Sequence, residues 1–207
     1  MQPAKTRTVD DYSEVMRREQ ATENVLLAYA PKPKRISFDA QIKNEQVILL
    51  LRQHPVVLIK PFVIFVLAMF FPMLVQVSTI LNFLPDQFKT AFAIGWYVMT
   101  FGFALESFLV WFFNVYIITD ERIIDVDFLS LIYKNLSIAK IDNIEDVTVT
   151  ASGALASIFD YGNVLIQTAA EKNEFEFENV PYPTRVSELL NELMVEEERE
   201  KLEGRVN

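Results

Sequence analysis

The sequence predicts a membrane-spanning α-helical hairpin followed by a small, mostly β soluble domain that a C-terminal helix closes. The first observation is a run of 23 residues without a formal charge, from Phe62 to Leu84. A second apolar run of the same length, Ala91 to Phe113, is interrupted only by Glu106. After Phe113 the hydrophobic pattern changes from a helical period to an alternating one, which is typical of short β-strands.

The segment before the first span is expected to contribute little ordered structure. Residues 1–37 predict a weakly structured cytoplasmic N-terminus, because the two prolines in YAPKPKR break any helix that precedes them. Residues 38–60 predict an amphipathic helix leading into the first span, since Ile42, Val47 and Leu50 have helical spacing. This helix could lie in the lipid headgroup layer or pack on the soluble domain, and the sequence leaves both open.

The two spans are expected at residues 61–84 and 91–113, joined by the short connection PDQFKT. At a rise of about 1.5 Å per residue, either span can cross a hydrocarbon core of roughly 30 Å. Pro72 falls within the first span, where it removes a backbone hydrogen bond to the carbonyl of Ala68 and should kink the helix. So short a connection places the soluble parts on the same side of the membrane.

Small and charged residues in the hairpin indicate where the spans could touch. Gly95 and Gly102 leave small surfaces at helical spacing, which we expect to bring the two helices close together, with a homodimer face as the alternative. Glu106 is expected to be a structural partner of Lys60, because an ionisable group that faces lipid is costly. The alternative is a proton or ion site at Glu106, which would make the chain a subunit of an oligomeric small transporter or channel.

Basic residues near the ends of the spans predict the orientation. Arg52 and Lys60 precede the first span and Arg122 follows the second, whereas the connection holds only Lys89. Positively charged flanks stay on the cytoplasmic side. Both termini are therefore predicted to be cytoplasmic. No cleaved signal peptide is expected, because the first residues lack an apolar core.

The soluble domain is predicted at residues 114–207, as a small antiparallel β-barrel of six or seven strands. A tight turn at Asp120 and Glu121 would join its first two strands. Residues 183–203 predict a closing helix, because Val186, Leu189 and Leu193 form one apolar stripe. The expected strands occupy residues 114–119, 122–127, 129–134, 136–140, 145–150, 163–168 and 174–178.

Five local matches resemble the bacterial pleckstrin-homology-like (PH-like) membrane proteins, in which a two-helix anchor precedes a PH-like β-domain. The most specific match contains Tyr116, Thr119 and Arg122, in the order of the family's Tyr-x-Leu-Thr-x-x-Arg-Ile signature. Asp160 departs from the pattern, because the family usually has glycine there. The resemblance implies a PH-like fold in a two-pass protein of a prokaryotic inner membrane, and it brings no catalytic residue. The other matches are Arg52 to Pro55 with His54, Ile141 to Val147, Phe159 to Val164 with Gly162, and Phe177 to Pro183.

Composition and missing motifs exclude several classes of function. Cysteine is absent, His54 is the only histidine, and no phosphate-binding or nucleophile motif is present, so no catalytic, cofactor or metal site is predicted. The net charge is −9, and the acids concentrate after Phe113. This charge disfavours nucleic acid and phosphoinositide headgroups as ligands. We therefore expect a non-enzymatic interaction or scaffold module that sits in the lipid bilayer and binds a protein partner or its own copies.

Overall fold

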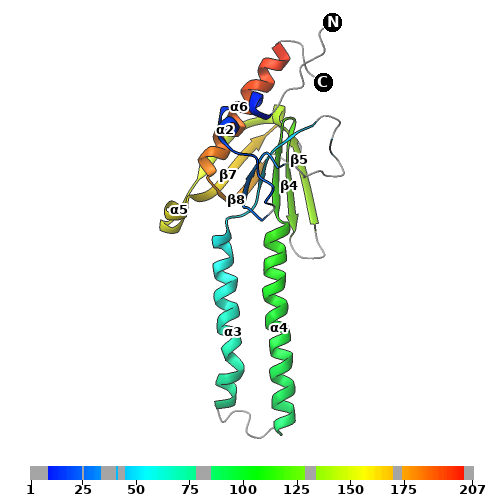
Figure 1. Ribbon diagram of the computed structural model, residues 1–207, viewed down its shortest axis with the longest axis vertical. Helices are drawn as coiled ribbons and strands as arrows, with labels where there is room; N and C mark the ends of the chain where they lie inside the picture. Colours follow the sequence, from blue (N-terminus) through cyan, green and yellow to red (C-terminus); the bar gives the residue numbers. More distant parts are fainter. Residues whose placement is uncertain are drawn as a thin grey trace.

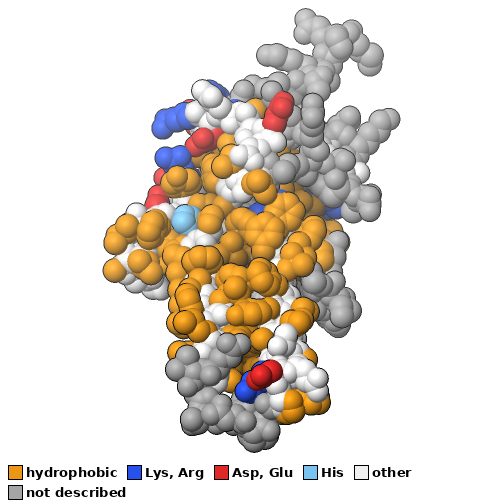
Figure 2. Space-filling view, turned by 60° about the horizontal axis from the view of Figure 1, so that its bottom comes forward, with side chains coloured by type: hydrophobic (Ala, Val, Ile, Leu, Met, Phe, Trp, Pro, Cys, Tyr) orange, Lys and Arg blue, Asp and Glu red, His pale blue; other side chains and the backbone are white. Residues whose placement is uncertain are grey.

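The computed structural model describes residues 9–24, 26–33, 41, 45–77, 85–128, 134–169 and 174–202. Two long helices, α3 (Ile59–Val77) and α4 (Asp86–Phe113), run side by side away from a domain of two sheets and several helices (Figure 1). A short 3-10 helix, η1 (Pro55–Leu58), precedes α3. Both long helices are long and apolar enough to cross a membrane, and most of their side chains face outward (Figure 2).

The larger sheet has five antiparallel strands, and the whole hairpin separates two that are adjacent. β2 (Val47–Leu51) pairs directly with β3 (Val115–Thr119), with Leu51 opposite Tyr116. The hairpin is therefore an insertion between neighbouring strands of one sheet, and its two ends are held at strand spacing. The remaining strands are β1 (Tyr29–Pro31) beside β2, and β4 (Arg122–Phe128) and β5 (Lys134–Lys140) beyond β3.

The smaller sheet has three antiparallel strands in the order β6 (Ile144–Thr150), β7 (Tyr161–Thr168) and β8 (Glu174–Pro181). Helix α5 (Ala154–Phe159) connects β6 to β7, and a 3-10 helix, η3 (Ile141–Asn143), leads from one sheet to the other. Within the described residues no strand pairing joins the sheets, so the predicted closed barrel is wrong. The chain turns out of the first sheet at η3, and side chains from both sheets fill a shared core instead.

The main core lies between the two sheets and α6 (Pro183–Leu202). The apolar stripe predicted for the closing helix is buried, with Leu189 fully covered and Leu193 3% exposed. On β8, Phe175 and Phe177 are fully buried, while the three glutamates that alternate with them, Glu174, Glu176 and Glu178, are exposed. Strict alternation of this kind places one face of a strand in the core and the other in water.

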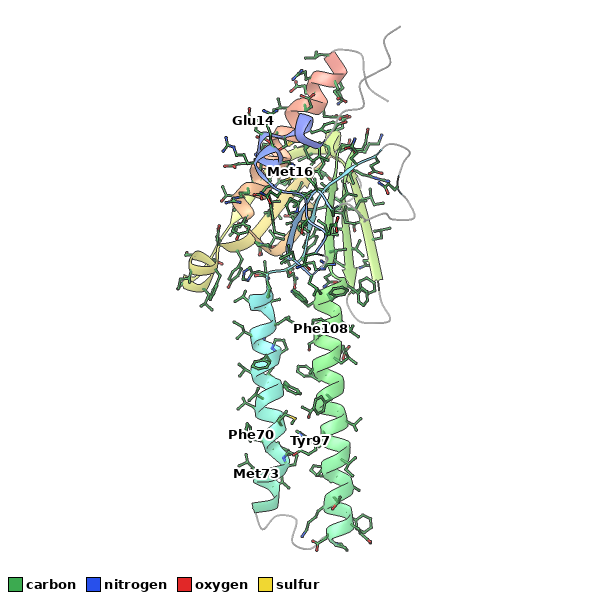
Figure 3. The ribbon with its side chains drawn as sticks, viewed as in Figure 1. Glu14, Met16, Phe70, Met73, Tyr97 and Phe108 are labelled. Carbon is green, nitrogen blue, oxygen red and sulfur yellow. The ribbon has the colours of Figure 1, made fainter. Side chains whose placement is uncertain are left out.

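Residues 9–18 and 29–31 of the N-terminal segment form two short helices and a strand, whereas the prediction was weak structure. Helices α1 (Val9–Tyr12) and α2 (Glu14–Arg18) pack against α6, and Met16 is fully buried in the main core (Figure 3). An ion pair of 2.8 Å between Arg185 and Glu19 joins the same elements. One long apolar side chain thus anchors a segment whose overall composition is polar.

The helix predicted at residues 38–60 is also wrong, because residues 47–51 form β2 instead. All five side chains of β2 are buried. Ile48 and Leu51 belong to the main core, whereas Val47 and Leu50 belong to a second apolar cluster on the other face of the sheet. A strand that is buried on both faces is apolar at every position. It therefore also has apolar residues at helical intervals, and the spacing does not distinguish it from a helix. Ile42 lies outside the described residues.

The strands predicted after the hairpin agree with β3 to β8 within three residues at each end, and the closing helix with α6. The expected strand at residues 129–134 lies almost wholly outside the described residues. Helix α5 was not predicted. The soluble domain also begins before residue 114, because β1 and β2 complete its larger sheet.

Candidate functional site: the junction between hairpin and domain

Arg52 ties the end of β2 to the end of α4. Its Nε donates to the carbonyl oxygen of Phe112 at 2.9 Å, and its guanidinium carbon lies 4.8 Å from the centre of the Phe112 ring. Its Nη1 donates to the carbonyl of Leu27 at 3.4 Å. Phe112 is in the last turn of α4, where unpaired carbonyls and the helix dipole favour a positive charge. Arg52 therefore stabilises the end of α4 and holds it against the sheet.

His54 begins the first helix of the hairpin and attaches it to the smaller sheet. Its backbone N–H donates to the carbonyl of Asn179 at 2.7 Å, and its Nδ1 accepts from the Val56 N–H at 3.2 Å. The imidazole stacks on the Tyr161 ring with centroids 5.3 Å apart. Burial lowers the pKa of His54, so the ring is neutral at pH 7 and Nδ1 can accept. The Nδ1 atom of His54 therefore acts as the N-cap acceptor of η1.

Trp111 holds the second helix at the same level. Its indole Nε1 donates to the carbonyl of Gln53 at 2.8 Å, and the side chain is 7% exposed. Sequence reasoning missed this contact, although a tryptophan near the end of a span must find an acceptor for its N–H once it is buried. We call the residues that bind hairpin to domain the junction: Arg52, Gln53, His54, Trp111, Phe112 and Asn179.

A buried ion pair lies at the turn between β3 and β4, at the end of β3 that is far from the hairpin. The carboxylate of Glu45 accepts from Arg122 Nε at 2.8 Å and from Arg122 Nη2 at 2.9 Å. The Thr119 hydroxyl lies 2.8 Å from Glu45 Oε1 and also accepts from the Arg122 N–H at 2.9 Å. Two signature residues of the resemblance, Thr119 and Arg122, therefore clamp the segment before β2 onto the first β-hairpin.

Tyr116 links the two sheets. It is 2% exposed, and its ring stacks on Phe177 of β8 with centroids 4.5 Å apart. Its hydroxyl accepts from the Glu178 N–H at 3.2 Å. Burial raises the pKa of Tyr116, so the hydroxyl stays neutral. The residue packs in the core and does not face solvent as a catalytic phenol would.

Gly162 and Asp160 explain the turn into β7. A Cβ on Gly162 would lie 2.7 Å from the carbonyl oxygen of Thr150, so only glycine lets β6 and β7 approach this closely. Asp160 ends α5 in the left-handed conformation with φ of 50°. Glycine adopts that conformation freely and aspartate tolerates it. Asp160 therefore adopts a backbone conformation that glycine would also adopt at this position.

Pro72 and Trp96 form a polar link inside the hairpin. Pro72 lies inside α3, which continues past it, and the missing N–H of Pro72 leaves the carbonyl of Ala68 without its helical donor. The indole Nε1 of Trp96 on α4 donates to this carbonyl at 2.8 Å, and the Trp96 ring stacks on Phe71 at 4.4 Å. The proline predicted to kink the helix thus creates an acceptor that the second helix uses.

The other polar and small residues of the hairpin do not lie where the sequence suggested. A Cβ on Gly95 or Gly102 would meet no atom within 4 Å, so neither glycine brings α3 and α4 together, and that prediction is wrong. Glu106 and Lys60 are both exposed, and no ion pair joins them within the described residues. Steps of seven and four residues place Gly95, Gly102 and Glu106 on one face of α4.

Comparison with known proteins agrees with this architecture. A model of the bacterial PH domain family matches residues 57–194, about two thirds of the chain. The chain belongs to this family. No curated protein and no solved structure matches it. The match begins at the hairpin, whereas β1, β2 and the N-terminal helices, which complete the larger sheet, precede it.

Family membership indicates an interaction module, and the junction determines how that module is held. PH domains bind proteins or lipids and are typically not catalytic. Within the described part of the chain no three acids or histidines are placed to hold a metal ion. Three hydrogen bonds of the junction, from Arg52 to Phe112, from Trp111 to Gln53 and from His54 to Asn179, instead hold the ends of the hairpin to each other and to the sheets.

Proposed function

We propose that this PH-domain protein is a two-pass protein of the prokaryotic inner membrane whose domain is a non-enzymatic interaction module at the cytoplasmic face. The observation that carries the proposal is the insertion of the hairpin between β2 and β3. Two attachment points to one sheet leave far less freedom than a single linker does. The domain would be held at a fixed height and angle above the bilayer, as a docking platform requires.

The orientation can be tested directly, because the chain has no cysteine of its own. Gln87 is in the first turn of α4 and Glu198 is near the C-terminal end of α6. Figure 1 shows these two helix ends at opposite ends of the molecule. In intact cells, a membrane-impermeant maleimide should label Gln87→Cys but label Glu198→Cys only after permeabilisation. Equal labelling of both sites in intact cells would contradict the two-pass orientation.

The partner surface that we propose is the edge formed by β8. Among the described strands it pairs only with β7, and its Glu178 N–H and Asn179 carbonyl already bond to Tyr116 and His54, so the partner strand would meet the other edge near Glu174 and Glu176. Glu174 and Glu176 are exposed along it. The acidic edge favours a protein partner with a basic extended segment, or an equivalent segment of a second copy.

Charge reversal tests this surface. We expect Glu174→Lys combined with Glu176→Lys to abolish recovery of the partner when the tagged chain is captured from gently solubilised membranes and the intact complex is weighed. Glu188→Lys with Glu198→Lys on α6 changes the net charge equally and should leave recovery unchanged. Retention of the partner by the first pair of substitutions would exclude β8 as the docking edge.

A second candidate function is a subunit of an oligomeric transporter or channel. The observation that favours it is Glu106, an exposed acid on the same face of α4 as two glycines. Two helices cannot enclose a path, so several copies would have to meet along that face. Proton or ion flux into vesicles should then be lost in Glu106→Gln, whereas flux and assembly equal to those of the wild type would eliminate this role.

A further inference from the structure

Helix α5 presents an apolar surface that the domain itself does not cover. Leu155, Ile158 and Phe159 are 54%, 72% and 48% exposed, while only Ala156 of this helix is buried. Positions i, i+3 and i+4 lie on one face of a helix, so the three large side chains form a single patch. The segment from Ala151 to Phe159 carries no charge that would keep this patch in water.

The patch lies at the hairpin end of the domain, beside the start of α3. Figure 1 shows α5 projecting from the domain at this end, and the ring of Phe159 lies 6.2 Å from the ring of His54, centroid to centroid. His54 immediately precedes η1, where the first apolar span begins. Figure 2 shows the apolar side chains of the hairpin continuing past the single histidine onto this outlying group.

We infer that α5 docks its apolar face into the interfacial layer of the same bilayer that the hairpin spans. This inference rests on the proposed membrane anchoring and adds a third contact beside the two spans. We take the lipid bilayer as the partner that covers this patch, because the patch is continuous with the apolar surface of the hairpin. A bilayer that surrounds the hairpin at the level of η1 would contact α5 as well. A short helix with one apolar face is suited to lying in the interface and cannot span the bilayer.

The uncharged character of the segment predicts how the contact forms. No basic side chain of α5 is available to bind anionic headgroups, so burial of apolar surface alone drives the contact. Insertion should therefore be the same in zwitterionic vesicles as in vesicles that contain anionic lipid. Docking would also brace the smaller sheet, since α5 leads directly into β7.

A single-cysteine fluorescence experiment on the full chain tests the inference. Ile158→Cys carries an environment-sensitive nitrobenzoxadiazole probe, and the protein is reconstituted into phosphatidylcholine vesicles containing lipids with a nitroxide at a shallow or a deep position. We expect blue-shifted emission and stronger quenching by the shallow nitroxide. Met99→Cys in the middle of α4 should be quenched most by the deep nitroxide, and Glu198→Cys on α6 by neither.

The probes at positions 158, 99 and 198 distinguish a failure of the α5 contact from a failure of the membrane anchor. An unquenched probe at position 158 together with a quenched probe at position 99 would overturn the role of α5 and leave the membrane anchor intact. Loss of quenching at both positions would overturn the anchor and, with it, the docking of α5. Blue-shifted emission at position 158 without quenching by lipid would mean that protein covers the patch, which also overturns the inference. A probe at Leu155→Cys on the same face should repeat the result for Ile158.

Discussion

At the scale of single residues, buried polar groups join segments of the domain to one another and to the hairpin. The Glu45 side chain is fully buried, and its loss of hydration is offset because Arg122 binds it through two N–H groups. Arg52 similarly offers its charge to the end of α4. Each of these side chains reaches a partner that is far away in the sequence, so each connects segments that would otherwise separate.

Removal of the Glu45 carboxylate should destabilise the fold strongly. Glu45→Ala leaves the Arg122 guanidinium without this carboxylate in a mostly buried site, and we expect a loss of about 3 kcal/mol of unfolding free energy. The matched control is Glu14→Ala, whose ion pair with Arg17 is 4.0 Å long and exposed, and which should cost less than about 0.5 kcal/mol. Denaturant unfolding of the full chain in detergent measures both, and equal losses would contradict the special role of Glu45.

Asp120 should make stability depend on pH. Burial raises the pKa of Asp120 from 3.8 to about 6, so the folded state binds more protons than the unfolded state between these values. Stability should therefore fall as the pH rises from about 4 to about 6. Asp120→Asn keeps an oxygen to accept the 2.9 Å hydrogen bond from the Gln46 N–H and removes the charge.

The Asn variant should exceed the wild type by about 1 kcal/mol above pH 6, since solvent screening reduces the full effect of the shift. The difference should vanish near pH 3, where the wild-type carboxyl is protonated in both states. Thermal unfolding of the full chain across this pH range measures the difference. A constant difference between the two proteins at all pH values would show that Asp120 does not titrate in the folded state.

Part of this residue-scale picture could be predicted from the sequence. The resemblance singled out Thr119, Arg122 and Gly162, and all three have structural roles in this fold. The pairing of Arg122 with Glu45 spans 77 positions and leaves no local pattern to detect. The contact of Trp96 with Ala68 could not be predicted for a related reason. Pro72 indicates that the Ala68 carbonyl lacks its helical donor, but it does not indicate which other donor binds there.

At the scale of elements, the errors of prediction have a common cause. Sequence periodicity identifies elements with one buried face, and it succeeded for α6 and for the strands after the hairpin. β2 is buried on both faces, so VILLL carries no period that separates a strand from a helix. Helix α5 is short and its apolar face is exposed, whereas a prediction from periodicity assumes that the apolar face of a helix is buried.

The hairpin elements should be coupled through Pro72 and Trp96. Trp96→Phe leaves the Ala68 carbonyl without its donor, and we expect a cost of about 1 kcal/mol in the wild-type background. Pro72→Ala restores a backbone N–H to α3, so Trp96→Phe should cost much less in that background. Unfolding of the four proteins in mixed micelles, followed by helical circular dichroism, gives the coupling. Additive costs would show that the cost of losing the indole does not depend on Pro72, which would contradict the coupling.

At the scale of the whole molecule, the hairpin is an insertion and the domain is the continuous structure around it. Every buried member of the main core lies before Pro55 or after Phe113. The hairpin contributes contacts at the junction but no side chain to that core. The chain is therefore a β-domain from which two helices extend between the end of β2 and the start of β3. The elements α1, α2, β1 and β2 belong to this domain although they precede the hairpin in the sequence.

This organisation predicts which part of the chain folds alone. A variant in which a short Gly-Ser turn replaces residues 55–113 keeps β2 beside β3, and we expect it to be water-soluble and to unfold cooperatively. Residues 114–207 alone lack Ile48, Leu49 and Leu51, whose burial is worth about 6 kcal/mol together, comparable to the whole stability of a small domain. That fragment should lack cooperative unfolding and dispersed amide resonances. A folded fragment 114–207 would show that β1 and β2 are accessory, and an unfolded Gly-Ser variant would show that the hairpin is needed to form the sheet.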